Sequence, residues 1–293
     1  MPARVLRGRI LFAACLAIAF AAAAGTVRTQ PSDVSVLVSV IDASGNPVTD
    51  LTSADFAIRE DGGDCEVISA KLSTEPLNVA LLADTSTMAD AYVPEMRNGV
   101  KTFIEALLGK APESKISIWE FGQAAVRIEN FTSDVAALSR TAGRLYPKPR
   151  SGSVLFEGIF DTSQALAGRP SPRRAIVIIN IEPADEQSIE EPRRIDASLA
   201  RSRAQVWAVS VQRGQLTNVK RDLVLNTLVR NAGGRREFIF AASAVDGYMR
   251  QYAAALSSQY QLTYRRTALT ATMLQVGVRR EGARVIAGSV APQ

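Results

Sequence analysis

The spacing of hydrophobic and polar residues changes twice along the chain. At both ends, apolar positions alternate with polar ones and β-branched residues are frequent, a pattern typical of short strands. In the middle, fully apolar runs alternate with stretches of helical spacing. The sequence therefore predicts a β segment at 25–75, an α/β domain at 76–257 and a second β segment at 258–293. The strands expected in the two end segments are 34–41, 56–60, 66–72, 260–265, 273–280 and 284–289.

In the middle segment, apolar strands are separated by amphipathic helices of roughly 10–15 residues, which predicts a doubly wound, mostly parallel sheet. Its expected strands are 79–83, 115–121, 125–131, 175–179, 205–211 and 237–240. Its expected helices are 94–108, 134–145, one ending at 167, 188–203, 222–231 and 243–256. Neither β end is large enough to fold alone, so we expect the two ends to pair into one small β-sandwich beside the α/β domain.

The first 24 residues have the order of a secretory signal peptide. Arg4, Arg7 and Arg9 precede an apolar run at 10–24 that ends in three alanines. That run is shorter than the roughly 20 residues of a membrane span, so we interpret it as an export signal rather than an anchor. No later segment is apolar enough to cross a bilayer. We expect a secreted or periplasmic protein with no integral membrane span once the signal is removed.

Charge gives little indication of a nucleic-acid partner. Removing residues 1–24 takes three of the 34 basic residues and no acid, which leaves 31 basic against 29 acidic side chains. The arginine pairs are scattered and lack interleaved aromatic residues, so a solvated surface explains them better than a nucleic-acid groove.

The histidine and cysteine content excludes several chemistries. The chain has no histidine, which rules out serine–histidine and cysteine–histidine catalysis and histidine-bound zinc. Its two cysteines are Cys15, inside the signal, and Cys65, so the mature chain has no partner for an intrachain disulfide. Whether Cys65 is buried or free for intermolecular pairing stays open at this point.

The most informative stretch is N-V-A-L-L-A-D-T-S-T-M, residues 78–88. Its buried strand delivers Asp84 to a turn at the carboxyl end of the predicted sheet, where open α/β sheets bind ligands. Asp84 and Ser86 together offer oxygen ligands of the kind that a hard divalent cation prefers. The same two residues are also ordinary helix caps, and the residues alone favour the cap.

The order of motifs resembles the von Willebrand factor type A (VWA) fold, and in particular exported bacterial proteins with a VWA-related domain. The resemblance covers nearly the whole mature chain. It rests on the Asp84 turn together with three further segments, each weak alone. They are V-S-V-I-D-A-S-G-N-P-V-T-D-L-T-S-A-D-F-A-I-R-E-D-G at 38–62, L-S-S-Q-Y-Q-L-T-Y at 256–264 and Q-V-G-V-R-R-E-G at 275–282.

The resemblance implies a metal-ion-dependent adhesion site, but this sequence matches it only in part. Asp84 and Ser86 match the first two ligands, and Met88 stands where another serine is expected. Ser153 replaces the threonine of the second loop and keeps its hydroxyl. Ile181 stands in place of the aspartate of the third loop. Glu182 and Asp185 are nearby acids, though neither is in register.

The incomplete ligand set predicts a degenerate site. Magnesium relies on carboxylates to offset its dehydration, and a thioether sulfur is a poor substitute for a hydroxyl oxygen. We expect no tightly bound cofactor, and at most weak binding of Mg²⁺ or Mn²⁺ by Asp84, Ser86 and Ser153.

The resemblance implies a non-catalytic adhesion or protein-interaction module with a protein partner at or outside the cell envelope. Contact would be made by the loops at 84–94, 147–156 and 180–192. If Met88 and Ile181 point outward they make this face apolar, and the alternative is that Met88 packs inward.

Two other functions remain. The first is a structural domain of an envelope assembly that adds an edge strand of its β-sandwich to a partner's sheet. The second and weaker one is a hydrolase that uses Ser86 beside Asp84, or Ser153 near Lys148. It lacks both a histidine base and the glycine context of a nucleophile elbow.

Overall fold

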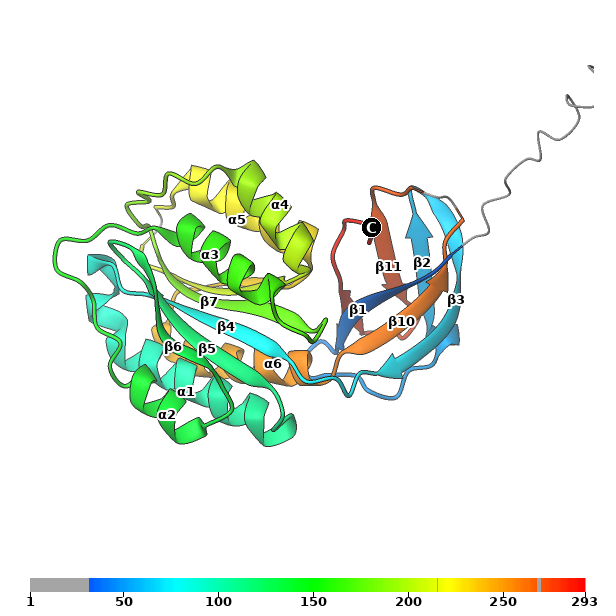
Figure 1. Ribbon diagram of the computed structural model, residues 1–293, viewed down its shortest axis with the longest axis horizontal. Coiled ribbons are helices and arrows are strands. Elements are labelled where there is room, and N and C mark those ends of the chain that lie inside the picture. The colour runs from blue at the N-terminus through cyan, green and yellow to red at the C-terminus, as the bar shows by residue number, and fades with distance from the viewer. Residues whose placement is uncertain (1–31, 215, 268–269, 293) are drawn as a thin grey trace, which may run out of the picture.

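The computed structural model describes residues 32–214, 216–267 and 270–292, which form two lobes side by side (Figure 1). The middle of the chain forms an α/β lobe, and strands from both ends of the chain form a β lobe. The expected signal peptide at 1–24 lies outside the described residues and stays a prediction.

The α/β lobe is built on a six-stranded sheet with the order β6-β5-β4-β7-β8-β9. β6 runs antiparallel to β5, and all other neighbours are parallel, as expected for a doubly wound sheet. The strand order reverses between β4 and β7, so this pair marks the topological switch point of the sheet. The strands are β4 (Asn78–Asp84), β5 (Lys115–Phe121), β6 (Ala125–Thr132), β7 (Arg174–Glu182), β8 (Gln205–Gln212) and β9 (Arg236–Ile239).

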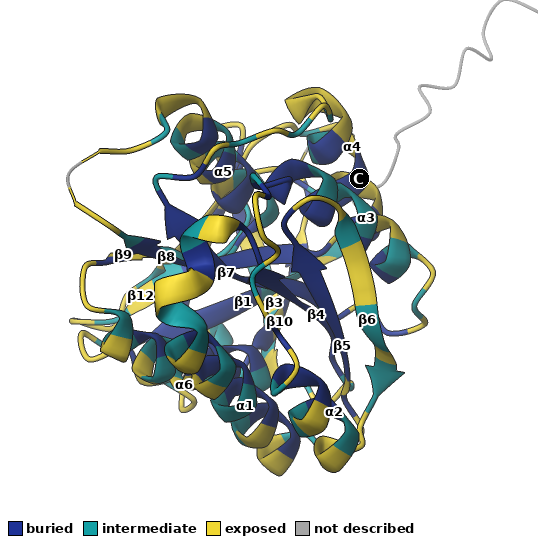
Figure 2. Ribbon diagram, turned by 90° about the vertical axis from the view of Figure 1, so that its left-hand side faces the viewer, coloured by how far each residue is buried: buried dark blue, intermediate teal, exposed yellow. Residues whose placement is uncertain are grey.

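Three helices cover each face of this sheet. Seen from the carboxyl ends of the parallel strands, α1, α2 and α6 lie on one side and α3, α4 and α5 on the other (Figure 2). No helix among the described residues is long and apolar enough to span a membrane. The helices are α1 (Val93–Lys110), α2 (Val135–Ala142), α3 (Leu155–Ala167), α4 (Pro192–Ser202), α5 (Val219–Ala232) and α6 (Val245–Ser257), and a short 3₁₀ turn, η2 (Thr87–Tyr92), precedes α1.

The two helical layers follow from the alternation of side chains along β4. Val79, Leu81 and Ala83 face the core beneath α1 and α6, whereas Ala80 and Leu82 face the core beneath α3 and α4. All seven residues of β4 are buried, because helices cover both faces of the central strands. The apolar run that predicted this strand is therefore the centre of two cores at once.

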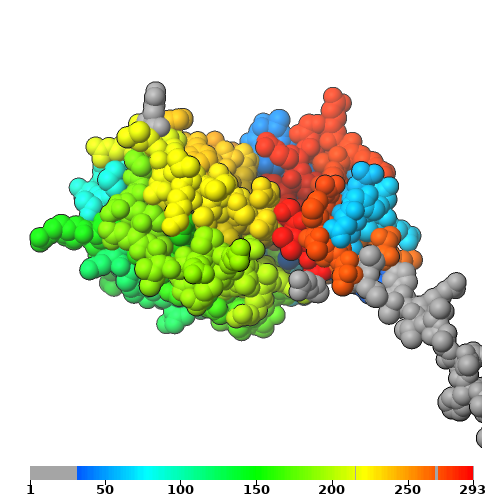
Figure 3. All heavy atoms as spheres, turned by 90° about the horizontal axis from the view of Figure 1, so that it is seen from above, coloured from blue at the N-terminus to red at the C-terminus, as the bar shows by residue number. Residues whose placement is uncertain are grey.

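The β lobe is a six-stranded antiparallel series with the order β11-β2-β3-β10-β1-β12. Strands from the two ends of the chain are interleaved in it, since the C-terminal strand β10 lies between the N-terminal strands β1 and β3 (Figure 1). Atoms from both ends of the chain, blue and orange to red, accordingly lie side by side over this lobe (Figure 3). A division of these strands into two facing sheets, as a sandwich requires, stays a prediction. The strands are β1 (Asp33–Ile41), β2 (Phe56–Glu60), β3 (Gly63–Leu72), β10 (Tyr260–Arg265), β11 (Leu274–Val278) and β12 (Arg284–Ile286), and the turn η1 (Ser53–Asp55) precedes β2.

A buried arginine joins the two lobes. Arg173 precedes β7, and its guanidinium donates to the carbonyl oxygens of Ser73, Glu75 and Leu256. Burial lowers the pKa of Arg173 to about 10, so the side chain is charged at neutral pH. Carbonyl oxygens from the linker after β3 and from the end of α6 thus share one cation.

Three boundaries near the candidate site differ from the sequence-based expectation. β7 continues to Glu182, three residues beyond the predicted end, because β8 pairs with it over that length. α4 begins at Pro192 instead of residue 188, because a proline fits the first turn of a helix and 183–191 form a loop. α5 begins at Val219, three residues early, because the Asn218 side chain caps it.

Candidate functional site

Asp84 lies at the end of β4, at the switch point of the sheet, and is completely buried. Its Oδ1 accepts a hydrogen bond from the backbone N–H of Ser86 at 2.9 Å, and its Oδ2 accepts one from the backbone N–H of Ile181 at 3.0 Å. The carboxylate therefore closes the turn that follows β4 and ties it to the end of β7. The Ser86 side chain makes no capping hydrogen bond to η2, so the predicted helix-cap role does not describe it.

The three predicted loops lie together at this end of the lobe (Figure 2), and hydrogen bonds join them. The loop after β4 is joined to the second loop by Thr87 N–H to the Ser151 carbonyl (3.1 Å) and by Lys148 N–H to the Thr85 carbonyl (2.8 Å). The second loop is joined to the third through the backbone of Ser153. Its N–H donates to the Asp185 carbonyl, and its carbonyl accepts from the Gln187 N–H, both at 2.8 Å.

The surviving hydroxyls of the predicted site are buried. Ser86 and Ser153 have at most 1% of their surface exposed, and their Oγ atoms have no hydrogen-bond partner among the described residues. The same holds for Oγ1 of Thr85. The Ser86 side chain is nevertheless close enough to the Asp84 carboxylate to lower its pKa.

The other two predicted positions are turned inward. Ile181 is fully buried in the core beneath α1 and α6, and Met88 packs against the same core. The idea that Met88 and Ile181 make this end of the molecule apolar is therefore wrong. Ile181 occupies a strand position whose side chain faces the helical layer, and only its backbone N–H reaches Asp84.

A fully buried arginine, Arg221, lies between the end of β4 and the third loop. Its Nε is 3.2 Å from Oε1 of Glu182 and 3.3 Å from Oε2 of Glu186, and its Nη2 is 4.0 Å from Oδ2 of Asp84. These are ion-pair distances. None of its guanidinium nitrogens makes a hydrogen bond of good geometry within the described ranges.

The start of α5 holds Arg221 in place. Oδ1 of Asn218 accepts from the Arg221 N–H at 3.1 Å, and Nδ2 of Asn218 donates to the Ala184 carbonyl at 3.2 Å. One asparagine therefore caps the helix and fastens it to the third loop. This places the arginine of the first helical turn over the carboxyl end of β7.

A second arginine extends the cluster towards the edge of the sheet. Arg236 on β9 is paired with Asp222 at 2.7 Å and lies 3.5 Å from Glu182. Its Nε donates to Ser210, whose hydroxyl donates in turn to Oδ1 of Asn180. Nδ2 of Asn180 then donates to Glu182 at 2.8 Å. The Glu182 carboxylate is thereby held from three sides.

Burial and the arginines act in opposite directions on these carboxyls. Burial raises the pKa of Asp84, of Glu182 and of Glu186, and in each case the charge of Arg221 is the largest influence that lowers it. Burial also lowers the pKa of Arg236. Removal of either guanidinium would leave buried carboxylates without their nearest counter-charge.

The residues present do not fit the divalent cation of an adhesion site. A Mg²⁺ bound at about 2.1 Å from Oδ2 of Asp84 would lie within roughly 6 Å of the Arg221 guanidinium. At an effective dielectric constant of about 20, the repulsion between these charges is about 5 kcal/mol. Two ligand positions are already lost to Met88 and Ile181. Within the described residues, no cluster of three or more acidic or cysteine side chains has metal-binding geometry.

Sequence reasoning missed Arg221 and Glu186, and of the two nearby acids it named, the structure uses Glu182. The side chain of Asp185 lies on the surface, where it accepts from Nε2 of Gln187 at 2.7 Å. Nothing in the local pattern around Arg221 distinguishes it from a solvated arginine before a helix. Its burial depends on acids contributed by β4, β7 and the third loop.

The lysine considered as a hydrolase base is already paired with a carboxylate. Nζ of Lys148 pairs with Glu120 at 3.0 Å, and 46% of the lysine side chain is exposed. A lysine base needs a desolvated environment without such a partner, because both exposure and a carboxylate favour its charged form.

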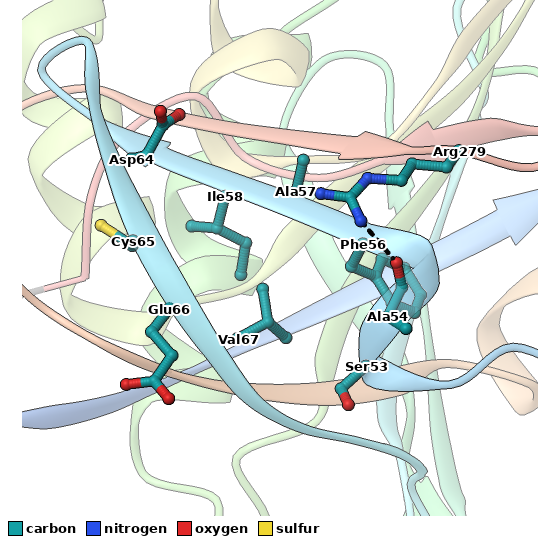
Figure 4. A pocket seen from close by; sticks show the side chains of 10 residues that line it. All are labelled: Ser53, Ala54, Phe56, Ala57, Ile58, Asp64, Cys65, Glu66, Val67 and Arg279. Atoms are coloured by element: carbon teal, nitrogen blue, oxygen red, sulfur yellow. Dashed lines mark hydrogen bonds between the residues drawn. The ribbon is translucent and has the colours of Figure 1, made fainter.

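A cavity of about 480 Å³ lies elsewhere, on the β lobe between β2 and β3 (Figure 4). Phe56, Ile58 and Val67 line it, together with charged residues at its rim. Cys65 borders it and is buried as a free thiol, its Sγ 3.8 Å from the Gly63 carbonyl. The cavity is far along the chain from Asp84 and shares no residue with the loop cluster.

The fold is of the VWA type. The chain is similar to the solved structure of a von Willebrand factor type A protein from Catenulispora acidiphila, with a TM-score of 0.51 and 9% identity over 87% of this chain and 72% of that one. It is also similar to proximal thread matrix protein 1 of the mussel byssus, with a TM-score of 0.50 and 11% identity over 73% of this chain and 50% of that one. No family model matches the sequence, and no curated protein matches it either.

Proposed function

We propose that this chain is an exported adhesion or protein-interaction module that works without catalysis and without a bound metal. It binds a protein partner at or outside the cell envelope through the three loops at the carboxyl end of its α/β sheet. Export is supported by the charged, apolar and small-residue order of residues 1–24. The VWA-type fold supports the choice of the loop end, where open α/β sheets bind their ligands.

The observation that carries the proposal is the closed set of hydrogen bonds between the loops. Asp84 joins the segments through its carboxylate, and Thr87 and Ser153 through backbone groups, so the face is already assembled. A preassembled surface loses little conformational entropy on binding a partner. Arg221 supplies positive charge beneath it without a metal.

The exposed apolar residues at this end differ from those that the sequence indicated. Ile189 in the third loop is 89% exposed, and Leu216 and Val219 at the start of α5 are also largely exposed. The bond from Asn218 to Ala184 keeps the start of α5 beside the third loop. Large exposed apolar side chains that share one end of a molecule favour a protein-binding role.

The alternative, addition of a β-lobe edge strand to a partner's sheet, is less well supported. The outer side of β11 is partly occupied, because Leu274 N–H donates to Ser289 and Ala291 N–H donates to Thr272. The same residue, Ser289, donates its own N–H to the Arg230 carbonyl of the α/β lobe. The backbone groups that strand addition needs are therefore partly satisfied within the chain.

The test is capture of partners from the medium and envelope fraction of the producing cells by the immobilised protein. Capture should be unchanged by EDTA and should fall at least tenfold for Ile189→Asp combined with Val219→Asp. Leu72→Asp, which places the same charge on an exposed β-lobe position, is the matched control and should capture normally. Loss of capture in EDTA, or in the Leu72 variant alone, would contradict the proposal.

A further inference from the structure

Among the described residues, Arg221 is the only side chain that lies within 4.0 Å of acids from the end of β4, the end of β7 and the third loop. Asp84 comes from the end of β4, Glu182 from the end of β7 and Glu186 from the third loop, and their oxygens lie 3.2 to 4.0 Å from its guanidinium nitrogens. Its side chain is 0% exposed. A buried guanidinium among carboxylates is a fixed positive charge, since arginine does not lose its proton in proteins.

We propose that Arg221 is the built-in cation of this end of the molecule and takes over the structural task that a divalent ion has in the fold. It neutralises carboxylates from separate segments and so keeps the loop after β4 and the third loop in register. The inference deepens the metal-independent binding proposed above, but its test needs no partner. The fold implies a cation at this position and the residues do not fit a metal ion, so the guanidinium of Arg221 on α5 supplies the positive charge instead.

Without the Arg221 side chain, three carboxylates would be left without their shared counter-charge. With Arg221 between them, the three carboxylates of the described structure do not form a metal-binding group. Without its side chain they can approach one another, and they remain on strand ends and on a loop that is hydrogen-bonded to Ser153. The unpartnered hydroxyls of Ser86 and Ser153 lie at the ends of the same loops. An all-oxygen, negatively charged environment is the kind that binds Mn²⁺ or Mg²⁺. Truncation of Arg221 should therefore create a divalent-cation site in a protein that has none.

The experiment measures Mn²⁺ binding by calorimetry and by the thermal midpoint for the wild type, Arg221→Ala and Arg221→Lys. The wild type should show no binding at 1 mM Mn²⁺. Arg221→Ala should melt well below the wild type in EDTA and should regain roughly 5 °C or more in saturating Mn²⁺. Arg221→Lys keeps the charge and should gain no Mn²⁺ dependence.

Arg173→Ala is the matched control, because Arg173 is also buried but binds carbonyl oxygens instead of carboxylates. It should destabilise the protein without any response to Mn²⁺. Adding Glu186→Gln to Arg221→Ala should weaken the gained Mn²⁺ affinity at least tenfold, which places the ion among these acids.

Two results would overturn the inference. The first is Mn²⁺ binding by the wild type that is lost in Asp84→Asn, since the dication and the guanidinium would then coexist. The second is an Arg221→Ala protein that folds and shows no Mn²⁺ response. If Arg221→Ala folds poorly, refolding in 1 mM Mn²⁺ against EDTA gives the same decision, because only a new cation site makes the yield depend on the metal. Failure of partner capture with normal Mn²⁺ results would contradict the proposed function and leave this inference standing.

Discussion

Oδ2 of Asp84 accepts a hydrogen bond from the backbone N–H of Ile181, 97 residues further along the chain, at 3.0 Å. The two residues lie on β4 and β7, the strands between which the sheet order reverses. The connections that follow the two strands leave in opposite directions at such a point, and the Asp84 carboxylate joins the two strand ends there. Asp84 has this structural role whether or not the loops bind a partner.

Replacement of Asp84 by alanine should destabilise the protein by about 3–5 kcal/mol. The change removes the acceptor for two buried backbone N–H groups and one of the counter-charges of Arg221. Urea unfolding followed by circular dichroism measures the loss. Asp185→Ala, at an exposed acid of the third loop, should change stability by less than about 0.5 kcal/mol. Equal effects of the two changes would contradict the role given to Asp84.

Arg173→Ala should cost about 3–5 kcal/mol and loosen the junction between the lobes. The guanidinium is the shared donor for carbonyl oxygens of Ser73, Glu75 and Leu256, which its loss leaves buried and unpaired. Hydrogen exchange should accelerate first in the linker around Ser73. The exposed pair of Arg59 with Asp64 provides the comparison, and Arg59→Ala should destabilise the protein far less than Arg173→Ala. Unchanged exchange at the linker in Arg173→Ala would show that other contacts hold the lobes together.

The sequence predicted the sheet well because local patterns determine it. The apolar run of β4 reflects burial on both faces of the sheet, and the alternation along β2 and β10 reflects burial on one face. Such spacing indicates a strand even when its neighbours are unknown. Strand ends are a different matter. β7 reaches Glu182 because β8 continues beside it, and that pairing is not visible in the residues of β7.

The candidate site was only half predictable for the same reason. Asp84, Ser86 and Ser153 follow apolar strands or open a helix, so their positions at one end of the sheet could be inferred. Arg221 lies in the first turn of a helix whose start the sequence placed three residues too late, at 222. A charged residue at such a position is predicted to be exposed to solvent unless its acidic partners are known. Those partners come from distant segments, so only the tertiary structure assigns Arg221 to the interior.

Asp61 provides a pH-dependent contribution to stability in the β lobe. Its carboxylate accepts from the backbone N–H groups of Met273 and Thr272, and these bonds lower its pKa from the usual 3.8. A carboxyl with a lowered folded pKa stabilises the protein above its unfolded pKa, and this contribution is lost as pH falls through the folded pKa. The stability difference between wild type and Asp61→Asn should therefore be largest near pH 7 and shrink below pH 3.8. A difference that is constant from pH 7 to pH 2.5 would contradict this.

Two glycines of α1 should respond in opposite directions to the same substitution. A Cβ on Gly99 would lie 2.5 Å from Cγ1 of Val245, because α1 and α6 pack closely at this point. Gly99→Ala should therefore cost about 1–3 kcal/mol through overpacking. A Cβ on Gly109 meets no atom within 4 Å among the described residues, so Gly109→Ala should stabilise the protein by up to about 1 kcal/mol through helix propensity. Chemical denaturation of both variants checks the pair, and a stabilised Gly99→Ala would show that α6 does not pack against α1 at that distance.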